Sequence, residues 1–318
     1  MFTLDELRRA RAVVGEAMPP TPQYAWPLLA ERAGAEVWVK HENHTPTGAF
    51  KVRGGLVYLD RLARERPEVA GLVSATRGNH GQSLAFAARR HGLPVTIVVP
   101  RGNSVEKNAA MRALGARLVE HGDDFEAARA EAERRAAAEG LEMVPSFHRD
   151  LVLGVATYAL ELLEAEPDLD ALYVPIGLGS GVCGCILARD LLGRRTEVIG
   201  VQSEGAPAYA LSLDAGRVMS TERSDTLADG IATRVPEPEA FAIIRAGASR
   251  VVRVSDEAVA EAVRAFWTDT HNLAEGAGAA GLAALLGERE RQRGRKVGVV
   301  LCGGNIDLAL FRRWILGT

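Results

Sequence analysis

The chain has 318 residues, of which 47% are hydrophobic and 25% are charged, a balance typical of a globular protein with a sizeable core. Its formal net charge of -3 gives no reason to expect nucleic acid or an anionic membrane as a partner. No apolar run is long enough to span a membrane. Neither nucleic acid nor a membrane is therefore predicted as a partner.

Short β-rich runs then alternate with helical patterns along the chain. The strands expected from these runs lie at 37–40, 71–75, 94–100, 116–119, 172–176, 197–202, 250–254 and 296–302. The expected helices lie at 54–64, 82–91, 104–114, 125–139, 154–163, 184–192, 207–215, 256–272 and 277–293. This alternation predicts an α/β fold with parallel sheets and ligand sites at the carboxyl ends of the strands. No flexible linker interrupts it, so two domains would pack closely.

The N-terminus and the cysteines indicate in which cellular compartment the protein is expected. Residues 1–11 mix acids and arginines without an apolar stretch, so no secretory signal is expected. Cys183, Cys185 and Cys302 have the spacing of neither a disulfide framework nor a zinc site. We therefore expect a cytoplasmic protein.

The segment 47–55, with the sequence TGAFKVRGG, places Lys51 between an aromatic ring and an arginine. A lysine can lose its proton and form a Schiff base, whereas an arginine stays charged. We expect Phe50 to form an apolar wall and Arg53 to add a positive charge that favours the neutral amine of Lys51. An ordinary surface lysine after a capping turn is the alternative. The chain has only four lysines for such chemistry, namely Lys40, Lys51, Lys107 and Lys296.

The segment 177–181, with the sequence GLGSG, follows an expected strand and opens a helix. Glycines there let backbone amides converge on an anion, and the helix N-terminus adds positive potential, so we predict a phosphate site. The run 179–184 also matches the dinucleotide fingerprint GxGxxG, with Glu197 or Glu204 at a suitable distance for a ribose. An NAD-dependent oxidoreductase is therefore the alternative from a different class.

Two further turns carry polar groups at expected strand ends. Asn79 and the amides of the turn 78–82 could hold a carboxylate or a phenolate-type oxygen, although Gly-Asn is also ordinary turn chemistry. Cys302 ends the last strand and has no nearby base, so we do not predict a nucleophile there. His41 and His44 lack a third ligand at metal spacing, and no metal site is predicted.

In this order along the chain, the segments 40–43, 47–55, 74–82, 177–181, 275–278 and 302–305 resemble the serine/threonine dehydratase family of pyridoxal-phosphate enzymes. The resemblance implies the type II fold, similar to tryptophan synthase β: an α/β protein of two closely packed domains, each an open, mainly parallel sheet flanked by helices. Residues 1–48 and 148–318 would form the large, cofactor-binding domain, and residues 49–147 the small domain.

The resemblance also implies pyridoxal 5'-phosphate as cofactor and a role for each motif residue. Lys51 would be the Schiff-base lysine and Phe50 would pack on the cofactor ring. Asn79 would bond the ring hydroxyl and Cys302 would meet the pyridine nitrogen. The phosphate would be held by Gly177, Gly179, Ser180 and Gly181, and the substrate carboxylate by Thr76 with the amides near Asn79 and His80.

The implied reaction is the dehydration and deamination of L-threonine and L-serine. Lys51 would remove the Cα proton, the β-hydroxyl would leave, and the product would hydrolyse to a 2-oxo acid and ammonia. A homo-oligomer, dimer or tetramer, is implied as well. Because the chain ends soon after Trp314, we expect an enzyme without the regulatory domain of biosynthetic threonine dehydratases.

Some positions depart from the family pattern. Arg77 stands where serine racemases carry a serine, so elimination is favoured over racemisation. Arg77 could bind a distal carboxylate, but we expect it to point to solvent. Ala49 replaces a serine, and Ala210 replaces a metal-binding carboxylate near Glu204 and Ala208, so no metal is predicted. A dehydratase of another β-hydroxy amino acid, a serine racemase and a non-catalytic sensor on the same fold remain alternatives.

Overall fold

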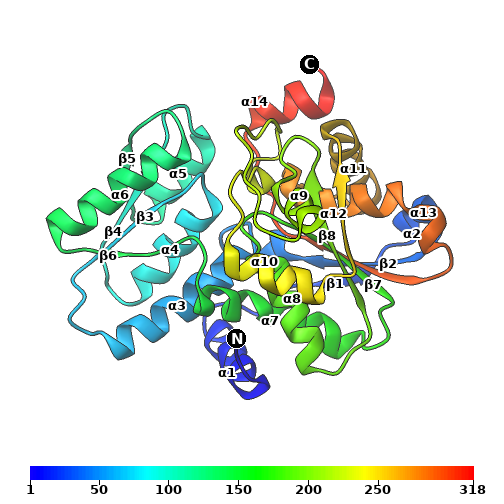
Figure 1. Ribbon diagram of the computed structural model, residues 1–318, viewed down its shortest axis with the longest axis horizontal. Coiled ribbons are helices and arrows are strands. Elements are labelled where there is room, and N and C mark those ends of the chain that lie inside the picture. The colour runs from blue at the N-terminus through cyan, green and yellow to red at the C-terminus, as the bar shows by residue number, and fades with distance from the viewer.

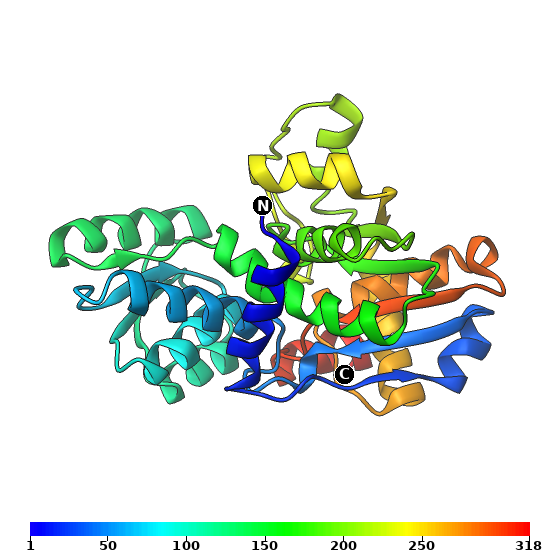
Figure 2. The same cartoon turned by 90° about the horizontal axis from the view of Figure 1, so that it is seen from below.

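Two sheets, each flanked by helices, organise the computed structural model, which describes residues 1–318 (Figure 1). The sheets lie in two lobes side by side, and the view from below separates them as well (Figure 2). This arrangement confirms the predicted fold class. No helix combines the length and the apolar character that a membrane crossing needs.

The smaller sheet has four parallel strands in the order β5-β4-β3-β6. Its central strands are buried along their whole length, which explains why their sequences are apolar runs without alternation. All four strands lie within 49–147, the range predicted for the small domain, although the boundaries themselves stay a prediction. The strands are β3 (Leu72–Ala75), β4 (Val95–Val99), β5 (Arg117–Glu120) and β6 (Glu142–Met143).

The larger sheet has six strands in the order β1-β2-β10-β7-β8-β9. Every pairing in it is parallel except that of β1 with β2 at one edge. Strands β7 and β10, near its centre, are buried almost throughout. The strands are β1 (Gln23–Ala25), β2 (Glu36–His41), β7 (Ala171–Pro175), β8 (Glu197–Ser203), β9 (Arg250–Val254) and β10 (Lys296–Leu301).

The helices connect the strands and cover the sheets. They are α1 (Leu4–Gly15), α2 (Pro27–Ala33), α3 (Lys51–Glu65), α4 (Asn79–Arg90), α5 (Val105–Ala113), α6 (Phe125–Glu139), α7 (Arg149–Ala165), α8 (Ser180–Leu191), α9 (Ala208–Ala215), α10 (Pro238–Gly247), α11 (Asp256–Thr270), α12 (Gly276–Gly287), α13 (Arg289–Gln292) and α14 (Leu308–Leu310). Short helical turns add η1 (Glu42–His44), η2 (Asp229–Ile231) and η3 (Phe311–Leu316).

Several helices begin earlier than the sequence predicted. Helices α3, α4 and α8 start three or four residues before the expected positions 54, 82 and 184. Their first turns contain or follow glycine, which has a low helix propensity and made them resemble loops. The single helix expected at 277–293 is wrong, because α12 ends at Gly287 and the separate α13 follows. Helices α1, α2 and α10 were not predicted.

Helices α3 and α7 join the two lobes. Helix α3 packs on α4 of the smaller lobe and on α7, which packs in turn on α8 of the larger lobe. At the α3–α7 crossing, a Cβ atom on Gly54 would lie 2.8 Å from the carbonyl oxygen of Leu151. One apolar core runs through this crossing and includes Ile97 in the smaller sheet and Val299 in the larger one. The predicted close packing of two sheet domains is therefore confirmed.

Candidate active site

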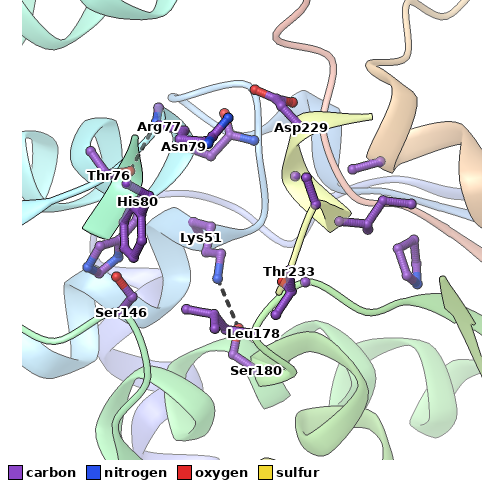
Figure 3. A pocket seen from close by; sticks show the side chains of 18 of the residues that line it. Lys51, Thr76, Arg77, Asn79, His80, Ser146, Leu178, Ser180, Asp229 and Thr233 are labelled. Atoms are coloured by element: carbon purple, nitrogen blue, oxygen red, sulfur yellow. Dashed lines mark hydrogen bonds between the residues drawn. The ribbon is translucent and has the colours of Figure 1, made fainter. Parts of the chain in front are cut away.

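A cavity opens where the carboxyl ends of strands from both sheets face each other (Figure 3). Thr76 follows β3, Gly177 follows β7 and Cys302 follows β10, so the cavity has the position expected of a ligand site in parallel sheets. The structure brings together in its wall all the site residues predicted from the sequence: Phe50, Lys51, Thr76, Asn79, His80, Gly177, Gly179, Ser180, Gly181 and Cys302.

Lys51 is the first residue of α3 and extends into this cavity. Its Nζ lies 3.1 Å from Oγ of Ser180 and 5.1 Å from the centre of the Phe50 ring. Burial lowers the pKa of Lys51 to about 8, and the thiol of Cys302 opposes this shift only in part. A larger fraction of the amine is therefore neutral near neutral pH than for an ordinary lysine, as covalent chemistry at a carbonyl requires.

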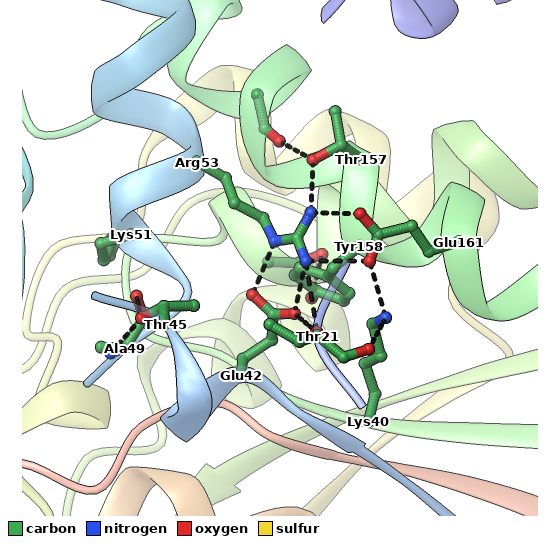
Figure 4. A network of polar contacts seen from close by, with 12 residues as sticks. Thr21, Lys40, Glu42, Thr45, Ala49, Lys51, Arg53, Thr157, Tyr158 and Glu161 are labelled. Carbon is green, nitrogen blue, oxygen red and sulfur yellow. Dashed lines mark hydrogen bonds and ion pairs between the residues drawn. The ribbon is translucent and has the colours of Figure 1, made fainter. Parts of the chain in front are cut away.

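The predicted contribution of Arg53 to this shift is wrong. Arg53 is two residues further along α3 and points to the opposite side of the helix, away from Lys51 (Figure 4). Its guanidinium is completely buried and forms ion pairs at 2.8 Å with Glu42 and at 2.7 Å with Glu161. Lys40 adds a second cation, 2.6 Å from Glu161, so this buried cluster of two cations and two carboxylates is neutral. The pKa of Lys51 is lowered by burial instead.

Lys51 differs from the other lysines in having no carboxylate partner. Lys40 pairs with Glu161, and Lys296 pairs with Glu166 at 2.8 Å and Asp168 at 2.6 Å. Lys107, the fourth, also pairs with two carboxylates, described below. A carboxylate partner favours the charged form of an ammonium, so Lys51, which has none, is the lysine best suited to act as a nucleophile.

The glycine loop at 177–181 forms the opposite wall and leads into α8. The backbone N–H groups of residues 177–181 donate no hydrogen bond within the protein. Gly179 has φ = 103° and caps the helix, and a Cβ atom there would lie 2.8 Å from the Cβ atom of Ala240. A side chain would therefore strain the backbone and crowd a neighbour. Free amides at a helix N-terminus form a site for an anion such as a phosphate.

A second set of free amides lies across the cavity, in the first turn of α4. The N–H groups of Asn79 and His80 donate no hydrogen bond within the protein, and Thr76 accepts one at 3.0 Å from the N–H of Gly78. Burial is the main cause that lowers the pKa of His80 to about 3, and the charge of the nearby Lys51 is the second. The His80 ring is therefore neutral at physiological pH. This turn offers a site for a carboxylate.

Cys302 lines the cavity directly after the end of β10. Burial raises the pKa of its thiol well above the ordinary value, and Glu275 adds to the shift, so the group is a neutral thiol. It therefore contributes no charge to a bound ring. A buried neutral thiol is also a poor nucleophile, in agreement with the sequence analysis.

Sequence analysis missed several residues that line the cavity. Lys107 is buried there. Ser146, Asp229 and Thr233 are also part of the wall (Figure 3). None belongs to a motif, and they reach the cavity only through folding. The scarcity of lysine was the one signal that could have drawn attention to Lys107.

Arg77 lines the cavity, although its side chain is exposed as expected. It forms no ion pair and no side-chain hydrogen bond, so its charge faces solvent at the edge of the cavity. The expectation of a solvent-facing guanidinium and the alternative role toward a distal carboxylate are both compatible with this position.

The dinucleotide alternative gains no support from the geometry. Glu197, proposed to bind a ribose, lies at the amino end of β8, whereas the glycine loop lies at the carboxyl end of β7. There Glu197 pairs with Arg250 at 3.1 Å and with Arg295 at 2.8 Å. Glu204 is exposed and does not line the cavity. The cavity is suited instead to a small cofactor that carries both an aldehyde for Lys51 and a phosphate for the glycine loop, as pyridoxal 5'-phosphate does.

Comparison with known proteins gives concordant results. Residues 14–303 match the family described as pyridoxal-phosphate dependent enzymes. The chain is 35% identical over 316 residues to the L-threonine ammonia-lyase of Thermotoga maritima, covering 99% of this chain and 78% of the relative. It is 34% identical over 298 residues to an L-threo-3-hydroxyaspartate ammonia-lyase of a Pseudomonas species, covering 93% of each. Among solved structures, maize serine racemase superposes with a TM-score of 0.91 at 26% identity, covering 99% of this chain and 97% of the other.

Proposed function

The chain belongs to the serine/threonine dehydratase family of pyridoxal-phosphate-dependent enzymes, and from that membership we propose that it is an ammonia-lyase. It converts L-threonine to 2-oxobutanoate and ammonia, and L-serine to the corresponding 2-oxo acid. Overlapping activity on both is expected, because one methyl group in a pocket changes binding by only about 1–3 kcal/mol.

One observation carries this proposal: a lysine with a lowered pKa and a cradle of free backbone amides face the same cavity. Lys51 supplies the amine for the aldehyde carbon, and residues 177–181 supply donors for the phosphate. A site for the aldehyde alone, or for the phosphate alone, would not distinguish pyridoxal 5'-phosphate from other ligands that carry that group.

The other site residues receive roles from their positions and from the family resemblance. Phe50 would pack on the cofactor ring, Asn79 would bond its hydroxyl, and the neutral thiol of Cys302 would face its pyridine nitrogen. Thr76 and the amides of Asn79 and His80 bind the substrate carboxylate. The phosphate is bound by Gly177, Gly179, Ser180 and Gly181.

Proton transfer falls to Lys51. When bound, the cofactor supplies the electron sink that stabilises negative charge at Cα of the amino acid. In its neutral form, the amine of Lys51 would accept the Cα proton of the amino acid. Ser180 lies within hydrogen-bond distance of that amine and holds it. The β-hydroxyl would leave as water, which balances the proton taken from Cα, and hydrolysis of the released product would give the 2-oxo acid and ammonia.

The test is to reconstitute the purified protein with pyridoxal 5'-phosphate and supply L-threonine. We expect a yellow protein that bleaches on borohydride reduction and that releases 2-oxobutanoate and ammonia in equal amounts. A colourless protein that binds a nicotinamide nucleotide would overturn the proposal.

A second candidate substrate is an acidic β-hydroxy amino acid such as 3-hydroxyaspartate, and Arg77 is the observation that favours it. Its unpaired guanidinium at the cavity edge could bind a second carboxylate with a charge-assisted hydrogen bond of about 1.5–3 kcal/mol. Turnover of 3-hydroxyaspartate but not threonine, lost in Arg77→Ala, would identify this substrate. We expect instead that Arg77→Ala changes threonine turnover little. Racemisation is disfavoured, because the guanidinium at position 77 cannot act as a base.

We further propose a cytoplasmic homo-oligomer, a dimer or tetramer. The three cysteines are free and buried, as is compatible with a reducing compartment. Trp267 is 54% exposed and Tyr24 is 52% exposed, and both are of the residue types enriched at subunit interfaces. Light scattering of the purified protein would measure the subunit number, and a monomer would contradict the oligomer.

A further inference from the structure

Lys107 reaches across the cavity from the smaller lobe to the larger one. It lies on α5, and its side chain passes over the turn at Gly78, where a Cβ atom would overlap it. Its Nζ is 2.6 Å from Oδ2 of Asp229 and 3.1 Å from Oε2 of Glu275. Both carboxylates belong to the larger lobe, and one ammonium therefore holds two segments of that lobe against α5.

The Glu275 branch of this contact leads to Asn79. Oε1 of Glu275 accepts a hydrogen bond of 2.6 Å from the side-chain amide of Asn79. The oxygen of that amide accepts one of 2.9 Å from Asn305, so both ends of the Asn79 amide are held. Lys107 thus acts on the orientation of Asn79 through Glu275.

The Asp229 branch leads to the outer wall of the cavity. Asp229 begins η2, and Gly230, Ile231, Ala232 and Thr233 follow it along the wall opposite the α4 turn. The side chain of Asp229 is 35% exposed, whereas that of Glu275 is 3% exposed. The Asp229 branch is therefore at the cavity mouth, and the Glu275 branch is in the interior.

We propose that Lys107 is a positioning residue that couples the two walls of the site, orienting Asn79 through Glu275 and holding residues 229–233 over the substrate through Asp229. This inference rests on the proposed function. It assigns to a residue outside every motif the separate control of cofactor binding and substrate binding.

The electrostatics support both branches. Burial disfavours the charge of Lys107, but Glu275 and Asp229 outweigh it and raise the pKa of the ammonium above its ordinary value. Burial also raises the pKa of Glu275, and Lys107 is the cation that opposes this shift. Without Lys107, the Glu275 carboxyl would become protonated more readily and would hold the Asn79 amide less firmly.

The test compares Lys107→Met, Asp229→Asn and Glu275→Gln with a matched control, Lys296→Met. Lys296 also holds two carboxylates at hydrogen-bond distance, but it does not line the cavity. For each variant, pyridoxal 5'-phosphate affinity is titrated without substrate, cofactor absorbance is recorded against pH, and kcat and KM are measured with the amino acid that the wild type converts. Melting curves show whether each variant is folded.

We expect Lys107→Met to weaken cofactor affinity and to raise KM, each by about tenfold or more, the value of one charge-assisted hydrogen bond. Asp229→Asn should raise KM without changing the absorbance profile, and Glu275→Gln should shift that profile with little change in KM. Lys296→Met should match the wild type in every readout.

Three outcomes would count against the inference. Lys107→Met indistinguishable from Lys296→Met would overturn it while leaving the proposed function intact. If Lys107→Met does not fold, an equal effect of Asp229→Asn and Glu275→Gln on both readouts would overturn it, because the two branches would not be separate. A wild type that binds no pyridoxal 5'-phosphate would overturn the proposed function, and this inference with it.

Discussion

Replacing Arg53 by methionine is the strongest test of the buried cluster beneath the Lys51 helix. The guanidinium makes six hydrogen bonds, to Thr21, Glu42, Thr157 and Glu161. The side chain of Glu42 is 0% exposed and would be left as a buried charge whose only remaining hydrogen bond comes from Thr21. Breaking a buried ion pair by removing one partner costs about 3–5 kcal/mol, so we expect Arg53→Met to lose that much stability.

Urea unfolding followed by circular dichroism would measure this loss. The double variant Arg53→Met with Glu42→Gln should recover part of it, because the uncompensated carboxylate is removed. Arg129→Met, which breaks an exposed pair with Glu133, is the matched control and should unfold like the wild type. A loss below about 1 kcal/mol in Arg53→Met, or no recovery in the double variant, would refute the reasoning.

Three further predictions concern the site and its pH dependence. Borohydride reduction and peptide mapping should find the pyridoxyl group on Lys51, and finding it on Lys40 would contradict the site assignment. Gly179→Val should lower cofactor affinity, because the side chain strains a backbone with φ = 103° and moves the amides, whereas unchanged cofactor retention would contradict the phosphate role. Burial lowers the pKa of His41 to about 4 and that of His80 to about 3, below their unfolded value near 6.5, so the unfolded chain binds protons first and stability should fall as the pH drops from about 6.5 toward 3. An unfolding midpoint that is constant between pH 7 and 5 would contradict this.

The residues of the site could be predicted from the sequence to the extent that they follow strands. Gly177 and Cys302 each come directly after an apolar run, and parallel strands bring their carboxyl ends to one edge. The position of these residues in one cavity is therefore a consequence of the strand pattern. The order of the motifs then indicated the family and the cofactor, which the comparisons support.

The remaining features depend on contacts that the pattern does not encode. Lys107 and Asp229 are 122 residues apart and meet only because the lobes fold against each other. The error at Arg53 had a local cause: residues two apart on a helix point in nearly opposite directions, so its charge could not act on Lys51. Had the helix been predicted from residue 51, where it begins, the mistake would have been avoided.

Positions 51 and 53 also set limits on amino-acid exchange in a chain that uses arginine for nearly all of its positive charges. An arginine at 51 would remain protonated and could not react with a carbonyl. A lysine at 53 would bring three donors to a place where six hydrogen bonds are made. Mutational bias in base composition can interchange the two residue types on the surface of such a protein. In this turn of α3, position 51 requires lysine and position 53 requires arginine. A bias toward either residue type would therefore have to leave both codons unchanged.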